Sequence, residues 1–153
     1  MLFGYAAGAV IASYVENFCT ATDKIAAHFH EWMTAAGGLY LRRHAPYVAT
    51  LFTTHATVMG RCIAGNHLPL YTDLTKFNAD ELARQFNVVA KHSIEKAAAA
   101  YHDAFVTVSD ITANECKFLL GREPDCTRRQ RLRKRLRLDR RGVRREARRS
   151  PQN

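Results

Sequence analysis

Histidines occupy alternate positions in the segment HFHEWM, as His28 and His30, and Glu31 follows directly. Imidazole and carboxylate groups can bind metal ions, transfer protons or form hydrogen bonds. On a strand both imidazoles would face one side, and Glu31 could complete a ligand set on spacing alone. Trp32 and Met33 follow without a further ligand, so the residues favour a hydrogen-bonded structural pair and no metal site.

The other reactive residue types form no motif for catalysis or for a cofactor. Ser109 is not part of a GxSxG sequence and precedes Asp110, so we predict that it caps a helix. Neither a GxGxxG nor a GxxxxGKS sequence occurs, so no dinucleotide or P-loop site is expected, and we predict no cofactor. The cysteines stand far apart with no CxxC pair, which argues against a zinc site and a secreted disulfide framework and favours the reducing cytoplasm. They are Cys19, Cys62, Cys116 and Cys126.

Three short, largely apolar segments are predicted to be buried strands, and the second of them is rich in β-branched and aromatic residues. They lie at about 25–30, 47–54 and 104–109, and helical patterns separate them. Strands of this kind predict a parallel sheet that helices cover on both faces. The fold class is therefore α/β, with a Rossmann-like sheet and flanking helices.

Helical patterns connect and flank these strands. We expect helices over about 32–43, over a continuous stretch at 79–103 that would be the longest element, and from Ser109 to the stop signal Gly121. Asn78 is the predicted cap of the long helix, and Glu95 with Lys96 is expected on its solvated surface or in a helix contact. A first, buried amphipathic helix is predicted from apolar spacing. Its stripe comprises Leu2, Tyr5, Ala6, Ala9, Val10, Ser13, Tyr14 and Phe18.

The polar residues gather where the predicted strands end. Open parallel sheets bind ligands outside the carboxyl ends of their strands. In this chain that edge would hold His28, His30, His55 and Ser109. The edge is the predicted ligand site.

Charge divides the chain of 153 residues into two unlike segments. Residues 1–125 hold 10 Lys and Arg against 12 Asp and Glu, whereas residues 126–153 hold 13 against 2. The net charge of +9 therefore describes the tail. We predict one folded domain at 1–125 and an Arg-rich disordered tail at 126–153.

The apolar opening segment is not expected to target or span a membrane. No Lys or Arg precedes its apolar run, and Glu16 and Asn17 interrupt it before the roughly 20 residues that a span requires. The expected location is the cytoplasm, with no membrane partner.

Four blocks resemble, in order and spacing, the glycogen synthases of the animal, fungal and Bacteroides-like type. The blocks are HFHEWM, FTTHATVMGR, HSIEKAAAA and FVTVSDITANE. The resemblance covers about 1–125 and implies part of the N-terminal domain of a GT-B glycosyltransferase. It also implies the family's reaction, the transfer of glucose from a nucleotide sugar to the non-reducing end of an α-1,4-glucan, with retention at the anomeric carbon. The expected donor is UDP-glucose or another nucleotide-glucose. The resemblance is compatible with an oligomeric parent enzyme.

The resemblance assigns roles to individual residues. It places the nucleotide-sugar contacts of the family on His55 and Arg61, with Arg61 about a turn and a half into the following helix. A guanidinium can bridge diphosphate oxygens, and a strand-end histidine can hydrogen-bond the sugar or phosphate as charge develops; the alternative for His55 is a core histidine. His28, His30 and Glu31 would line or support the inter-domain cleft. The other catalytic groups of the family lie outside the matched region, so no catalytic residue is expected here and the chain alone would be inactive.

The tail admits three interpretations, of which the third, a frameshift product, fits best. Its arginine density is typical of an arm that binds nucleic acid without sequence preference, and an alternative function is a basic-tailed binding module on an α/β scaffold. A basic disordered tail without a partner is the plainer interpretation. The third is that a frameshift near codons 126–129 produced the tail. One permitted choice of codons from Gln130, read one base later, encodes NGFENDFVWTDEEFDAKR. The family has a segment of this kind at this point. On the third interpretation nucleic-acid binding is a non-specific effect of the tail.

Overall fold

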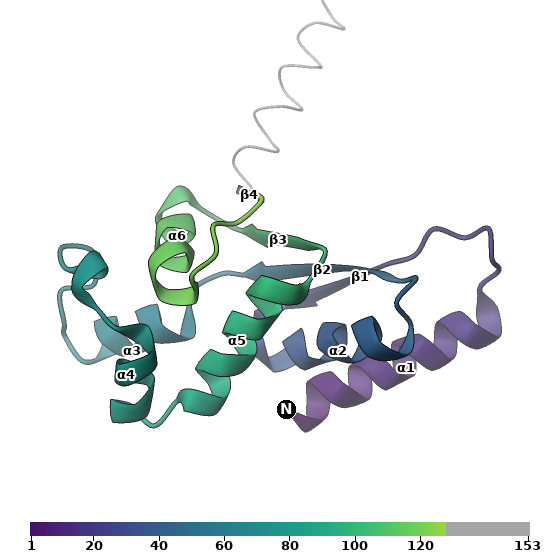
Figure 1. Cartoon of the computed structure of the whole chain (residues 1–153), viewed down its shortest axis with the longest axis horizontal. Helices are drawn as coiled ribbons and strands as arrows, with labels where there is room; N and C mark the ends of the chain where they lie inside the picture. The colour runs from purple at the N-terminus through teal and green to yellow at the C-terminus, as the bar shows by residue number, and fades with distance from the viewer. Residues whose placement is uncertain (128–153) are drawn as a thin grey trace, which may run out of the picture.

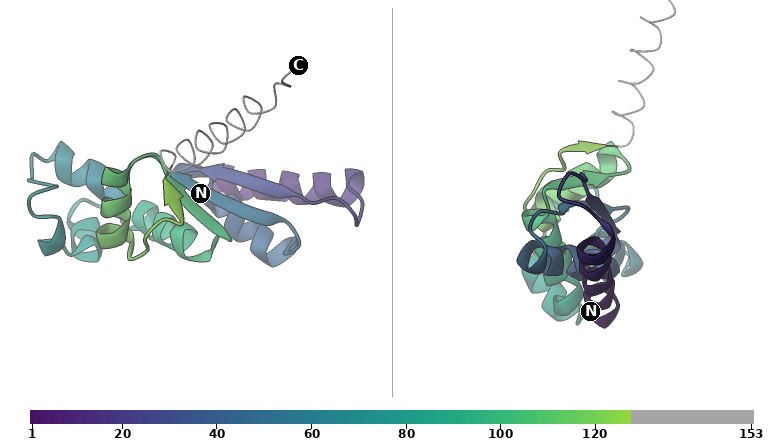
Figure 2. Two further views of the ribbon diagram at one scale, coloured as in Figure 1. Left: turned by 90° about the horizontal axis from the view of Figure 1, so that it is seen from above. Right: turned by 90° about the vertical axis from the view of Figure 1, so that its right-hand side faces the viewer.

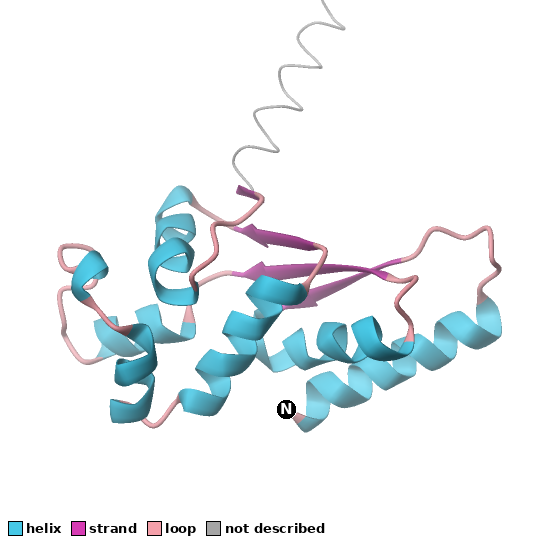
Figure 3. Ribbon diagram, viewed as in Figure 1, coloured by secondary structure: helices cyan, strands magenta, loops and turns pink. Residues whose placement is uncertain are grey.

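The computed structural model describes residues 1–127, in which helices lie along one face of a parallel sheet (Figures 1 and 3). The elements are α1 (Leu2–Phe18), β1 (Ala26–His30), α2 (Glu31–His44), β2 (Ala49–Thr54), α3 (Val58–Gly65), the 3-10 turn η1 (Leu74–Lys76), α4 (Ala79–Gln85), α5 (Val89–Tyr101), β3 (Ala104–Thr107), α6 (Asp110–Glu115), the π-helical turn η2 (Cys116–Leu120) and β4 (Cys126–Thr127).

Within the described residues the sheet has four strands in the order β1-β2-β3-β4, and every neighbouring pair is parallel. The predicted α/β class and the three predicted strands are confirmed. The fourth strand, Cys126–Thr127, pairs with Val106 and Thr107, so ordered structure continues two residues past the predicted boundary at residue 125. The rest of the predicted tail lies outside the described residues.

Within residues 1–127 helices cover only one face of the sheet, so the prediction of two covered faces is wrong for this part of the chain, and α3, α4 and α6 lie past the carboxyl ends of the strands (Figure 1). Figures 1 and 2 show α1, α2 and α5 on the same side of the strands. On that side lie Phe29, Phe52 and Phe105, all buried, with the rings of the last two stacked. Strand residues of opposite parity, such as His28 and Leu51, point away from the helices. Apolar residues on both faces of the strands suggested a second layer of helices, which residues 1–127 do not form.

Helix α1 packs against α2 through glycine, and the predicted buried stripe on α1 is wrong. A Cβ atom on Gly8 would come within 2.7 Å of the Gly37 carbonyl oxygen, and one on Gly37 within 2.8 Å of the Gly4 oxygen. Such a close approach of two backbones excludes large side chains from the contact. Of the larger apolar residues of α1, Val15 is buried in the core and Ile11 packs against it. The others are exposed; they are Leu2, Phe3, Tyr5, Val10, Tyr14 and Phe18.

The predicted continuous helix at 79–103 is two helices, so α1 is the longest element of the described chain. Asn87 adopts a left-handed conformation, with φ of 55°, between α4 and α5. Asparagine tolerates this region better than most residues, and the chain turns there. Phe86 and Val88 then pack against a second apolar cluster beneath α3 and α4, and Val89 is about half exposed.

Helix ends follow the predicted signals. The side chain of Asn78 accepts a hydrogen bond from the amide of Glu81, and that of Ser109 accepts one from the amide of Thr112. Gly121 ends the last helical turn with φ of 73°. None of the helices in residues 1–127 combines the length and the apolar character needed to cross a membrane.

Candidate functional site

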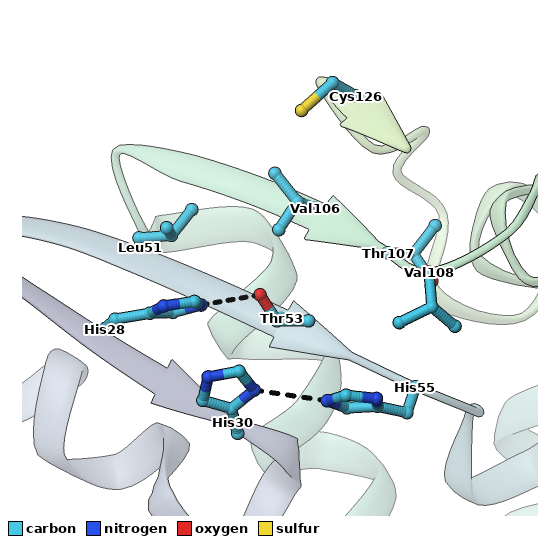
Figure 4. Close-up of a pocket in the computed structure, with 9 residues that line it drawn as sticks. All are labelled: His28, His30, Leu51, Thr53, His55, Val106, Thr107, Val108 and Cys126. Atoms are coloured by element: carbon cyan, nitrogen blue, oxygen red, sulfur yellow. Dashed lines mark hydrogen bonds between the residues drawn. The ribbon is translucent and has the colours of Figure 1, made fainter. Parts of the chain in front are cut away.

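Three histidines meet on the uncovered face of the sheet and at its carboxyl edge (Figure 4). His28 Nε2 lies 2.7 Å from the hydroxyl of Thr53, and His30 Nδ1 lies 3.1 Å from His55 Nε2. The rings of His28 and His30 are 4.1 Å apart, as alternate positions on one strand predict. They line a pocket together with Leu51, Thr53, His55, Val106, Thr107, Val108 and Cys126.

These contacts make the histidines a hydrogen-bonded group. The bond between His30 and His55 needs a proton on one ring nitrogen and a lone pair on the other. Among residues 1–127 no three or more His, Cys, Asp or Glu side chains are placed to hold a metal ion. The group can therefore offer imidazole donors and acceptors to a polar ligand at the edge of the sheet.

Glu31 joins the histidine edge to the following helices. It is the first residue of α2 and has φ of 64°, a left-handed conformation that is unfavourable for a glutamate. Its Oε1 accepts a hydrogen bond of 2.9 Å from the backbone amide of His55 and lies 3.5 Å from a guanidinium nitrogen of Arg61. One carboxylate oxygen thus contacts both residues to which the resemblance assigns the nucleotide sugar.

Arg61 projects from α3 next to that carboxylate. It is the fourth residue of the helix, which begins at Val58, so it lies about one turn in and not the predicted turn and a half. Its side chain is 62% exposed, compared with 17% for Glu31. The guanidinium is therefore open to an anion, and the carboxylate of Glu31 beside it forms an ion pair with it.

The loop that carries His55 is also held from the inside of the molecule, by Glu95. This residue of α5 is fully buried, which excludes the first of the two predicted positions, the solvated surface, and leaves the packed one. Its neighbour Lys96 pairs with Asp80 at 2.8 Å. Glu95 Oε1 accepts a hydrogen bond of 3.0 Å from the Thr54 hydroxyl, and Oε2 accepts one of 2.8 Å from the Val58 amide. Burial raises the pKa of Glu95 to about 7.

A second buried carboxylate supports the start of α3. Glu115 accepts a hydrogen bond from the hydroxyl of Thr57 and another from the phenol of Tyr71, each at 3.0 Å. The hydroxyl of Thr57 in turn accepts a bond of 2.8 Å from the Gly60 amide and so caps the helix. The segment between β2 and α3 is thus surrounded by three carboxylates, from Glu31, Glu95 and Glu115.

The structure brings together the residues that the sequence singled out, with one exception. Ser109 caps α6 and approaches the site through Thr112, whose hydroxyl lies 3.5 Å from the His55 carbonyl oxygen. The buried carboxylates were missed. A signal for Glu95 was present, because it lies three and four positions before the buried Ala98 and Ala99 and so on the apolar face of its helix.

Comparison with known proteins gives consistent matches. A family model described as glycogen synthase matches residues 1–135. The glycogen [starch] synthase of Dictyostelium discoideum is 38% identical over 125 residues, which are 82% of this chain and 14% of that protein. That of Neurospora crassa is 36% identical over 126 residues, 82% of this chain and 17% of the relative. The human liver glycogen [starch] synthase is 38% identical over 101 residues, 66% of this chain and 14% of the relative. The chain thus spans less than a fifth of the length of these relatives.

Proposed function

The chain belongs to the glycogen synthase family, and we propose that it forms part of the N-terminal domain of a GT-B glycosyltransferase. The proposed reaction transfers glucose from UDP-glucose to the non-reducing end of an α-1,4-glucan, with retention at the anomeric carbon. In this proposal the chain contributes one side of the donor site, and the remaining catalytic groups lie outside it. The proposed location is the cytoplasm, which suits a chain with four free thiols.

The single observation that carries the proposal is the convergence of His55 and Arg61 on Glu31 at the carboxyl edge of the sheet. Crevices at that edge are where open parallel sheets bind ligands. A ligand there would meet an exposed guanidinium and an imidazole, which is a suitable pair for a sugar diphosphate.

The chemistry follows from where charge accumulates. When the glycosidic oxygen of the donor leaves, negative charge grows on the diphosphate, so a cation and a hydrogen-bond donor aimed at it bind more strongly in the transition state than before. We assign Arg61 to the diphosphate and the ring of His55 to the sugar or the phosphate. Glu31 accepts the hydrogen bond of the His55 backbone amide and forms an ion pair with Arg61. His30 orients the ring of His55 through the hydrogen bond between the two imidazoles.

Binding of UDP and UDP-glucose to the 153-residue chain tests this proposal. We expect saturable binding that weakens by about tenfold or more in Arg61→Ala and in His55→Ala, because each change removes a charge-assisted or polar contact. Arg42→Ala is the matched control, because Arg42 pairs with Asp103 at the opposite ends of the strands. Circular dichroism establishes that each variant is folded. A folded wild type without saturable UDP binding, or equal losses in the control, would contradict the proposal.

A further inference from the structure

We propose that Glu95 is a positioning residue of the donor site and that it acts on His55 and Arg61 through two hydrogen bonds. It does not touch the expected ligand position. It fixes the loop that connects β2 to α3, and the inference rests on the proposed function only for the identity of the ligand.

The geometry places the two contacts of Glu95 on either side of His55. One oxygen receives the hydroxyl of Thr54, the last residue of β2, and the other receives the amide of Val58, the first residue of α3. His55 lies between these two fixed points. A single side chain on a separate helix therefore sets the distance between the end of the strand and the start of the helix that carries Arg61.

The opposite side of the loop has its own support. The carboxylate of Glu31 receives the amide of His55, so hydrogen bonds hold the backbone from outside at His55 and from inside at Thr54 and Val58. Removal of the inner contacts would leave the Val58 amide, one of the orphan donors of a helix start, without its partner in a buried position. The loop would then move to satisfy that donor, and His55 would move with it.

The role needs hydrogen bonds and not a charge, which makes it testable by an isosteric substitution. In Glu95→Gln the amide oxygen can accept from Val58, and the amide nitrogen can donate to the hydroxyl of Thr54. That hydroxyl can then donate to the carbonyl oxygen of Ala56, which already lies 3.2 Å away. Glu95→Leu has a similar volume and keeps neither contact.

The experiment compares wild type, Glu95→Gln and Glu95→Leu, with Glu81→Leu as an exposed control, by amide hydrogen exchange and by UDP titration. In Glu95→Leu we expect the His55 amide to exchange about tenfold faster relative to the core amide of Phe105, and UDP affinity to fall about tenfold. Glu95→Gln should keep both values within about twofold of wild type. A purely structural role would instead lower the protection of both amides together.

A second variant covers the case in which Glu95→Leu does not fold. Val58→Pro removes the amide that binds Glu95, and proline is well tolerated at the first position of a helix. Thr57 has φ of −66° and ψ of 148°, the conformation that a residue before proline requires. We expect the same faster exchange at His55. An unchanged exchange rate of the His55 amide in Glu95→Leu or Val58→Pro would overturn the inference. If the wild type does not bind UDP, the proposed function is contradicted, and the exchange rates alone then decide whether Glu95 positions His55.

Discussion

Replacement of Glu95 by glutamine should stabilise the protein at alkaline pH and leave its stability nearly unchanged at acidic pH. The carboxyl group is fully buried, and burial raises its pKa from 4.5 to about 7. Ionised Glu95 is therefore less favourable in the folded protein than in the unfolded chain. A glutamine amide has nearly the same shape, retains both hydrogen bonds and never carries the charge.

The size of the effect follows from proton binding. Between pH 4.5 and pH 7 the unfolded chain loses the Glu95 proton while the folded protein keeps it, so the wild type loses stability as pH rises through this window. The difference between the two pKa values corresponds to about 3 kcal/mol, and it is fully developed above pH 7. Other titrating groups occur in both proteins and cancel in the comparison.

Urea denaturation of wild type and Glu95→Gln at about pH 5 and about pH 8.5 measures this difference. Between about pH 5 and about pH 8.5, the stability of Glu95→Gln relative to wild type should increase by most of the expected ~3 kcal/mol. A stability difference that does not change with pH would refute the account of Glu95 as a buried, desolvated carboxyl group. A variant that is less stable at both values would refute the argument that glutamine retains both hydrogen bonds.

Three further predictions concern other parts of the chain. Burial lowers the pKa of His102 from 6.5 to about 4, so the free energy of unfolding should fall by about 3 kcal/mol as the pH drops from 6.5 to 4. In His102→Phe this decline should be smaller, as measured by urea denaturation at a series of pH values. Gly38→Ala should destabilise the fold by about 2 kcal/mol or more because its Cβ would overlap the ring of His102, whereas Gly65→Ala, with open space around it, should change the melting temperature little. Deletion of residues 128–153 should abolish any salt-sensitive binding of the chain to a DNA duplex and leave UDP binding intact; a loss of UDP affinity would contradict the placement of the donor site in residues 1–127.

The strands and most helix ends could be predicted because local signals determine them. Short apolar runs identified β1, β2 and β3, and the caps at Asn78 and Ser109 formed as their side chains suggested. The break at Asn87 was missed because good helix formers on both sides outweighed one asparagine. The buried face of α1 was missed because the contact with α2 depends on how closely two backbones approach, which glycines permit and apolar spacing does not reveal.

The candidate site was predictable only in its outer part. The strand-end position of His55 and its proximity to His30 follow from the parallel sheet, because neighbouring strands end at the same edge. The buried role of Glu95 does not follow from its helix alone, since its donors, at the end of β2 and the start of α3, lie 41 and 37 positions earlier in the chain. Local patterns report which face of a helix is apolar, and they do not report which buried polar partner lies opposite.

The most direct test of the central claim is a two-dimensional NMR titration of the isotope-labelled chain with UDP-glucose. We predict saturable shifts at the backbone amides of His55 and Arg61 and at the imidazole of His55, with the amides at the opposite ends of the strands unchanged. Shifts that are absent from these residues in a well-folded sample, or that are confined to residues 128–153, would contradict the assignment of a donor site to the carboxyl edge of this sheet.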